Sequence, residues 1–102
     1  GQPDIDALRT ALKQHGGKLK AVVLVNPSNP SGHVCSEQSQ RCVLSECAAH
    51  GTWVISDEAY EHFVYDGKAE NVATADSSAR MVRLFTFSKS FGLAGWRVGY
   101  MV

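Results

Sequence analysis

The chain has 102 residues, of which 44% are hydrophobic and 20% are charged, and its formal net charge at pH 7 is zero. This length and composition suit one compact globular unit. The balanced charge argues against nucleic acid or an anionic membrane surface as the main partner. No apolar run approaches the roughly 20 residues that a bilayer-spanning helix requires.

The cysteines and histidines do not suggest a metal site or a disulfide framework. Cys35, Cys42 and Cys47 are odd in number, and their spacing fits neither pattern. Cys42 and Cys47 fall in an expected helix, where small packing residues are the favoured interpretation. The four histidines are scattered and lack the spacing of a metal-binding helix face, so we expect no metal.

The first third of the chain reads as helix, strand and turn. Asp4 can cap a helix over 5–15, which Gly16-Gly17 would end. The run AVVLV at 21–25 is rich in β-branched residues and predicts a strand buried on both faces, as in a parallel sheet. The block NPSNPSG at 26–32 consists entirely of turn-forming residues.

The rest of the chain continues this alternation. Ser36 can cap a second helix over about 37–50, and a short buried strand is expected at 53–56. Residues 66–78 read as a polar loop, and MVRLFTF at 81–87 reads as a third strand.

A fourth strand begins in VGYMV, residues 98–102. Helix-length segments between buried strands predict an α/β fold with a largely parallel sheet. Because the chain stops inside this strand pattern, we expect it to be a piece of a longer protein. Under that expectation the isolated chain could also be a catalytically inactive fragment.

Polar side chains that could bind a ligand or take part in catalysis follow three of these strands. In open α/β sheets, ligands bind beyond the carboxyl ends of the strands, so these side chains are expected at one edge. The set provides amide, carboxylate, phenol, hydroxyl, amine and guanidinium groups, from Asn26, Asn29, Asp57, Glu58, Tyr60, Ser88, Lys89 and Arg97.

Each of these residues has a plainer interpretation when taken alone. Lys89 could be a solvated surface charge, and Arg97 could belong to a surface ion pair of little energetic value. Asp57 and Glu58 could cap the turn after their strand, and Asn29 could simply tolerate a tight turn. The combination of these residues, in this order and at these spacings, favours a shared site.

Three blocks then carry a family resemblance: NPSNPSG, DEAY at 57–60 and SKSFGLAGWRVGY at 88–100. From Ala21 to Val102 the chain resembles the large domain of fold-type I pyridoxal-phosphate (PLP) enzymes, and most of all the class I and II aminotransferases. Ser31 stands where the family more often has threonine. The resemblance implies a mainly parallel sheet with flanking helices, with residues 1–102 forming a single piece of that domain, truncated at both ends.

The resemblance also implies roles for four residues. Lys89 would form the Schiff base with the PLP aldehyde and later move the proton between substrate and cofactor. Asp57 would hold the pyridine nitrogen protonated, which makes the ring an electron sink. Tyr60 and Asn29 would both contact the phenolic oxygen of the cofactor.

The remaining implied contacts are to the cofactor phosphate. Arg97 would bind it with its planar guanidinium, and the hydroxyls of Thr86 and Ser88 would add further contacts. Gly92 and Gly95 would let the backbone between Lys89 and Arg97 turn tightly.

The implied activity is amino-group transfer between an amino acid and a 2-oxo acid, in an intracellular homodimer of the cytoplasm or an organelle. Cyclopropane-forming synthases, carbon–sulfur lyases and decarboxylases of the same fold stay open as alternatives, because a fold alone does not define a reaction. Glu61-His62-Phe63 after the DEAY block looks more like aminotransferases than lyases. The sequence lacks the family's upstream phosphate loop, its ring-stacking aromatic residue and its arginine for the substrate carboxylate.

Overall fold

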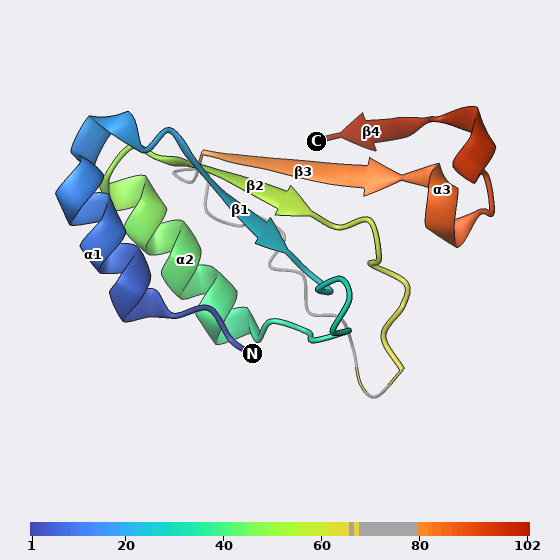
Figure 1. The fold of residues 1–102 in the computed structure, drawn as a ribbon, viewed down its shortest axis with the longest axis horizontal. Coiled ribbons are helices and arrows are strands. Elements are labelled where there is room, and N and C mark those ends of the chain that lie inside the picture. The colour runs from blue at the N-terminus through green and yellow to red at the C-terminus, as the bar shows by residue number, and fades with distance from the viewer. Residues whose placement is uncertain (66, 68–79) are drawn as a thin grey trace.

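The computed structural model describes residues 1–65, 67 and 80–102. Its centre is a four-stranded sheet in the order β1–β2–β3–β4, with two long helices beside it (Figure 1). The elements are α1 (Ile5–His15), η1 (Gly16–Lys18), β1 (Ala21–Val25), α2 (Glu37–Ala49), β2 (Trp53–Asp57), β3 (Met81–Thr86), α3 (Phe87–Ser90), η2 (Ala94–Trp96) and β4 (Gly99–Met101).

The sheet is mainly parallel, as the sequence predicts. β2 pairs in parallel with β1 on one side and with β3 on the other. β4 runs antiparallel to β3 at the edge. The prediction of an α/β fold with flanking helices is therefore confirmed for the described residues.

The helix ends follow their capping residues. Asp4 accepts a hydrogen bond from the backbone N–H of Ala7 at 2.9 Å, so α1 begins at Ile5, and it ends before Gly16, whose φ is +49°. These are the boundaries expected for the first helix. Ser36 accepts from the N–H of Ser39 at 3.2 Å and starts α2 in the same way.

Two boundaries in the middle of the chain shift by one residue. The second helix ends at Ala49 rather than at 50, and β2 extends through Asp57 rather than stopping at 56. The longer strand has a structural consequence, because Asp57 then pairs with Val25 of β1 and Leu84 of β3. Of the polar loop expected over 66–78, only residue 67 belongs to the described part, so that expectation lies outside it.

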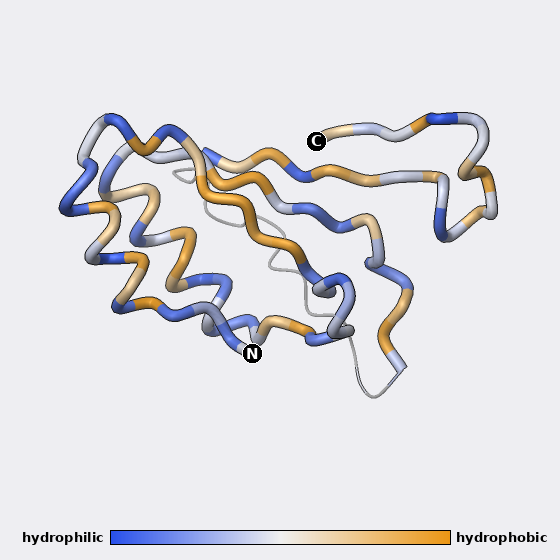
Figure 2. Tube along the Cα trace, in the orientation of Figure 1, coloured by the Kyte–Doolittle hydropathy of each residue, from blue (hydrophilic) through white to orange (hydrophobic). Residues whose placement is uncertain are grey.

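The hydrophobic core lies between the helices and one face of the sheet. Side chains of a strand alternate between the two faces, and those facing the helices form the core. α2 contributes most of its buried members, while the strands show as hydrophobic stretches in Figure 2. The core cluster contains Val43, Leu44, Cys47 and Val54, with Ile5, Leu8, Val22, Leu24 and Met81 packed against it.

The opposite face of the sheet is not covered by the described residues. The expectation that 21–25 is buried on both faces is wrong here, because Val23 is 61% exposed and Val25 is 37% exposed. Trp53, the first residue of β2, is 44% exposed. Both helices pack on the same face, so alternate side chains of these strands meet no second layer among the described residues.

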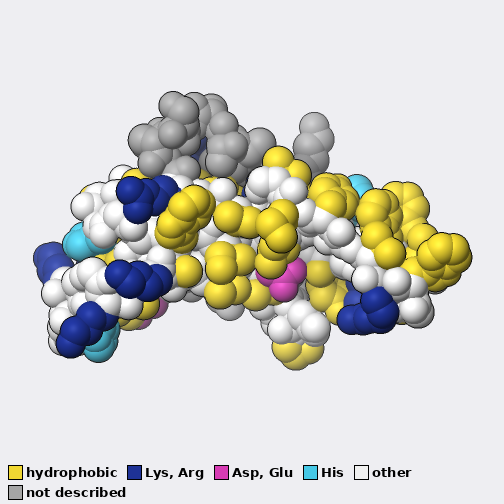
Figure 3. All heavy atoms as spheres, turned by 90° about the horizontal axis from the view of Figure 1, so that it is seen from above, with side chains coloured by type: hydrophobic (Ala, Val, Ile, Leu, Met, Phe, Trp, Pro, Cys, Tyr) yellow, Lys and Arg dark blue, Asp and Glu magenta, His cyan; other side chains and the backbone are white. Residues whose placement is uncertain are grey.

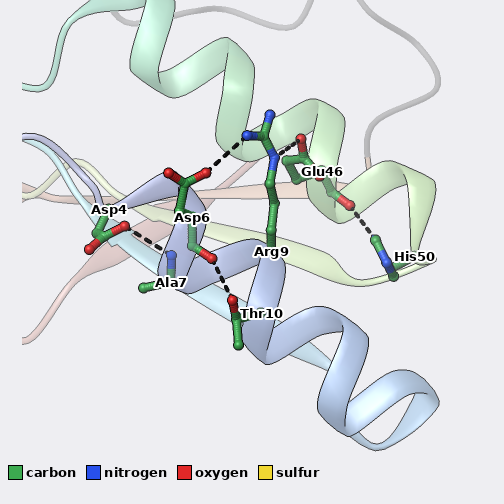
Figure 4. A network of polar contacts seen from close by, with 7 residues as sticks. All are labelled: Asp4, Asp6, Ala7, Arg9, Thr10, Glu46 and His50. Carbon is green, nitrogen blue, oxygen red and sulfur yellow. Dashed lines mark hydrogen bonds and ion pairs between the residues drawn. The ribbon is translucent and has the colours of Figure 1, made fainter.

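A polar network joins the two helices on their outer side (Figure 4). Arg9 of α1 contacts Glu46 of α2 through its Nε at 2.7 Å, and also reaches Asp6 at 3.2 Å. Thr10 donates to the carbonyl of Asp6, and His50 contacts the carbonyl of Glu46, each at 2.9 Å. Of these contacts, only Arg9–Glu46 joins the two helices, and exposed ion pairs of this kind contribute little to stability.

The third strand ends earlier than the sequence predicts. Its expected last residue, Phe87, instead begins α3, because Thr86 Oγ1 accepts the N–H of Ser88 at 3.1 Å and caps a short helix. β4 then returns along β3, with the rings of Phe85 and Tyr100 stacked 4.8 Å apart. Gly99 allows this approach, since a Cβ there would lie 2.6 Å from the carbonyl oxygen of Phe85.

Within the described ranges, no group of three or more His, Cys, Asp or Glu residues could hold a metal ion. In those same ranges no helix has the length and hydrophobicity needed to cross a membrane. Cys35 and Cys47 are buried as free thiols, and this burial raises the pKa of both groups. Cys47 belongs to the core, as a packing residue would.

Leu12 provides a test of this packing. Its side chain is fully buried on α1, so Leu12→Ala in the full-length protein should cost roughly 2–5 kcal/mol of stability by leaving a cavity. We expect a thermal unfolding midpoint several degrees below that of the parent. The control is Lys13→Ala, an exposed position on the same helix, which should leave the midpoint nearly unchanged. Equal midpoints for the two variants would contradict the packing described here.

Candidate functional site

The candidate site lies at the carboxyl ends of the three parallel strands. Their register aligns Val25, Asp57 and Leu84, so the segments that follow the strands leave the sheet at one edge. This edge is where ligands bind in open α/β sheets. Asp57 is the last residue of β2, so it lies between the segments that follow β1 and β3.

The loop after β1 is held by its own hydrogen bonds. The backbone N–H of Asn26 donates to the carbonyl of Asp57 at 3.0 Å, which extends the β1–β2 pairing by one residue. The buried Asn26 Oδ1 accepts from the N–H of Cys35 at 2.8 Å and closes the loop. The N–H of Ser28 donates to His33, and that of Gly32 donates to Ser28. The sequence identifies Asn26 as one of the polar residues at this edge, and its side chain proves to have a structural role.

This closed loop holds Asn29 exposed at its tip. Asn29 Nδ2 lies 3.4 Å from the hydroxyl of Tyr60, a long hydrogen bond across 31 residues of sequence. The two residues also line one small cavity of about 140 Å³, together with Phe63 and Tyr65. That volume is below the roughly 300–1,000 Å³ of typical ligand pockets, so the described residues outline only part of a binding site.

Asp57 itself is half-buried at the end of β2. Its Oδ1 accepts from the backbone N–H of Ala59 at 3.1 Å, so it does cap the turn after its strand, as the plainer interpretation of this residue holds. Its second oxygen, Oδ2, has no hydrogen-bond partner among the residues that the structure describes. Capping and ligand binding are therefore compatible for this carboxylate.

Lys89 comes from the other side of the site, on α3. The capped turn at Thr86 places it just beyond β3, and its side chain is exposed. Its Nζ lies 5.6 Å from the centroid of the Tyr60 ring. Tyr60 thus lies near both the amide of Asn29 and the amine of Lys89, although the three residues come from separate segments.

Within the part of the chain that the structure describes, Arg97 makes no hydrogen bond or ring contact with Asn29, Tyr60 or Lys89. It follows η2 in the left-handed region, with φ +54°, and its Nη1 donates to the carbonyl of Ala94 at 3.2 Å. Among the described residues it alone, apart from glycines, has a positive φ, a conformation found more often at functional sites than elsewhere. Gly92, in the turn before it, has φ +64°, as a tight turn requires.

The hydroxyls proposed for phosphate binding are near Lys89. Thr86 Oγ1 already accepts the N–H of Ser88, but a hydroxyl can still donate its own hydrogen to a ligand. Both residues are half-buried at the start of α3.

One polar pair at this edge was missed by the sequence reasoning. Glu58, only 1% exposed, binds Arg83 of β3 through two contacts, from Nε at 2.7 Å and from Nη2 at 2.6 Å. Hydrogen bonding to Glu58 raises the pKa of Arg83 further above its ordinary value. The available signal was the arginine inside the apolar run MVRLFTF, which requires a partner if it faces the core.

Comparisons with known proteins show the family to which this chain belongs. The profile of the family described as "Aminotransferase class I and II" matches residues 1–102. An aromatic aminotransferase of Arabidopsis thaliana is 38% identical over 99 residues, which are 97% of this chain and 24% of that relative. A probable aspartate/prephenate aminotransferase of Aquifex aeolicus is 41% identical over 88 residues, and the match covers 82% of this chain and 22% of that relative.

The fold of this chain also matches a solved structure. An alanine aminotransferase structure from Pyrococcus furiosus superposes with a TM-score of 0.86 and 31% identity, over 98% of this chain and 25% of that one. The chain thus belongs to the class I and II aminotransferase family, within the fold-type I PLP enzymes. It spans about a quarter of the length of the relatives it matches.

Proposed function

We propose that the full-length protein containing these residues is a PLP-dependent aminotransferase, which transfers an amino group between an amino acid and a 2-oxo acid. The observation that carries the proposal is that Tyr60, just after β2, lies near both Asn29 and Lys89, in a chain of this family. The alternative reactions of the fold are not favoured, because the relatives reported above are named as aminotransferases.

The donor set supports PLP as the cofactor. An amine that can bind an aldehyde, a carboxylate suited to a protonated ring nitrogen, and an amide and a phenol suited to an oxyanion all lie at one sheet edge. When bound, PLP supplies the electron sink that stabilises negative charge at the substrate Cα. Family membership implies this cofactor in general, and the residues present fit it.

The roles of the residues follow from their chemistry. Lys89 Nζ would hold the cofactor through its aldehyde and, when not so bonded, could carry a proton to and from the reacting carbon. Asp57 would accept a charge-assisted hydrogen bond from the ring N–H, and its Oδ1 already accepts the N–H of Ala59. Asn29 and Tyr60 would donate to the ring oxygen and favour its ionised form.

The phosphate is assigned to residues at the start of α3 and just after η2. Arg97 provides the charge and the paired N–H donors, and Thr86 and Ser88 provide hydroxyls. Substrates are an amino acid and a 2-oxo acid, and we propose a homodimer as the assembly. The parts of the chain beyond these residues would contribute the remaining contacts to cofactor and substrate.

Lys89 is testable by chemical trapping. Borohydride reduction of the full-length protein with PLP, followed by peptide mapping, should place the pyridoxyl label on Lys89. A Lys20→Ala variant, changed at an exposed lysine before β1, should keep the label, whereas Lys89→Ala should lose it. A label found on another lysine of the parent would overturn the assignment.

Asp57 is testable by turnover. Asp57→Asn in the full-length protein should still bind PLP but transaminate about 10²–10³-fold more slowly, because an amide does not hold the ring nitrogen protonated. Single-turnover kinetics with an amino-acid donor measure this directly. Asp6→Asn, at an acid on the outer surface of α1, is the control and should keep parental rates. Near-parental turnover of Asp57→Asn would mean that another residue serves the ring nitrogen.

A further inference from the structure

The buried ion pair between Glu58 and Arg83 has no role in the reaction as described so far. Both carboxylate oxygens are used: Oε1 accepts from Arg83 Nε and from the hydroxyl of Ser56 at 3.0 Å, and Oε2 accepts from Arg83 Nη2. The Glu58 side chain is 1% exposed and that of Arg83 is 22% exposed. This is a two-contact arrangement, which orients both groups more tightly than a single contact would.

Stability is a weak reason for such a pair. Removing two charges from water is costly, and replacing a buried ion pair by apolar residues of similar volume is often neutral or stabilising. Removing one partner alone is harmful, because it leaves a buried charge unpaired. The pair must therefore be considered for what it orients as well as for what it stabilises.

The pair ties together the two strands that carry the site. Glu58 directly follows Asp57 and stands two residues before Tyr60, and its backbone N–H donates to the carbonyl of Leu84 at 2.9 Å. Arg83 lies in β3, six residues before Lys89. The side-chain pair thus fastens β2 to β3 where their backbone pairing ends.

A series of ring contacts continues from Arg83 to α3. The guanidinium carbon lies 4.9 Å from the centroid of the Phe85 ring. Phe85 stacks on Tyr100 at 4.8 Å, and Tyr100 contacts Phe87 at 5.6 Å. Phe87 is the first residue of the helix that carries Lys89.

We propose that Glu58 and Arg83 are positioning residues, which hold Asp57 and Tyr60 in register with Lys89. This inference rests on the proposed function. Neither residue is among those assigned above to the cofactor. The pair fixes the distance between the segment that would contact the ring and the helix that would bind it covalently. Misplacement of such groups by about 1 Å can cost on the order of 10²-fold in rate.

The test removes the whole polar cluster at once in the full-length protein. The variant Ser56→Ala/Glu58→Leu/Arg83→Met leaves neither a buried charge nor an unpaired hydroxyl, so it should unfold at or above the parental temperature. If the pair positions the site, kcat should fall at least about tenfold, with a smaller change in KM. The pH midpoint at which the absorption band of bound PLP changes should also shift, because Tyr60 would no longer be held where it favours the ionised form of the ring oxygen.

The control is a second arginine–glutamate pair away from the site, which has a single contact and is more exposed. Arg9→Met/Glu46→Leu removes the 2.7 Å contact between α1 and α2 and should leave kcat and the pH midpoint unchanged. If the triple variant does not fold, Arg83→Lys replaces it: a lysine keeps the charge but not the two-contact geometry, so kcat and the midpoint should still move.

The outcomes separate this inference from the proposed function. A parental protein with neither a PLP absorption band nor transamination overturns the proposed function and this inference with it. A parental protein with both, together with a folded triple variant of unchanged kcat and unchanged pH midpoint, overturns this inference alone. The same holds for an unchanged Arg83→Lys variant where the triple variant does not fold.

Discussion

The parallel pairing of β2 with both of its neighbours is the constraint on which the rest of the structure depends. It brings the carboxyl ends of three strands to one edge of the sheet. Because side chains alternate along a strand, it also determines on which face of the sheet each β2 side chain lies. Val54, Ser56 and Glu58 are buried. Asp57 lies between Ser56 and Glu58 and faces the other way. A slip of one residue would exchange the two neighbouring acids and place the wrong carboxylate at the site.

Local chemistry explains why much of the fold could be predicted from the sequence. Asp4 and Gly16 define the first helix because capping depends only on neighbouring residues, and the strand at 21–25 follows from its β-branched run. The end of β3 was missed for an equally local reason, since the cap that Thr86 offers to α3 outweighs the apolar pattern of Phe87. The exposure of Val23 could not be predicted, because it depends on which elements pack on each face.

The candidate site was predictable in composition but not in arrangement. The strand ends identified Asn29, Asp57, Tyr60, Lys89 and Arg97, and the family motifs gave them roles. The contact between Asn29 and Tyr60 spans 31 residues and depends on how the loop after β1 closes on itself, partly through Asn26. The partnership of Glu58 with Arg83 likewise spans 25 residues and depends on strand register. No residue pattern encodes either contact by itself.

Contacts among the described residues hold the elements of Asp57, Tyr60 and Lys89 more firmly than the segment of Arg97. Asp57, Tyr60 and Lys89 sit on elements tied to one another by the sheet, by the buried Glu58–Arg83 pair and by the ring contacts of Phe85. From residue 91 to 102, in contrast, every residue is exposed, and hydrophobic side chains gather at the end of the molecule opposite the two long helices (Figure 3). Arg97 lies in this exposed segment and bonds only to the nearby Ala94 among the described residues. Its orientation toward a phosphate would therefore depend on packing that these residues do not supply, whereas Asp57 and Lys89 follow strands that the sheet and the ion pair already join.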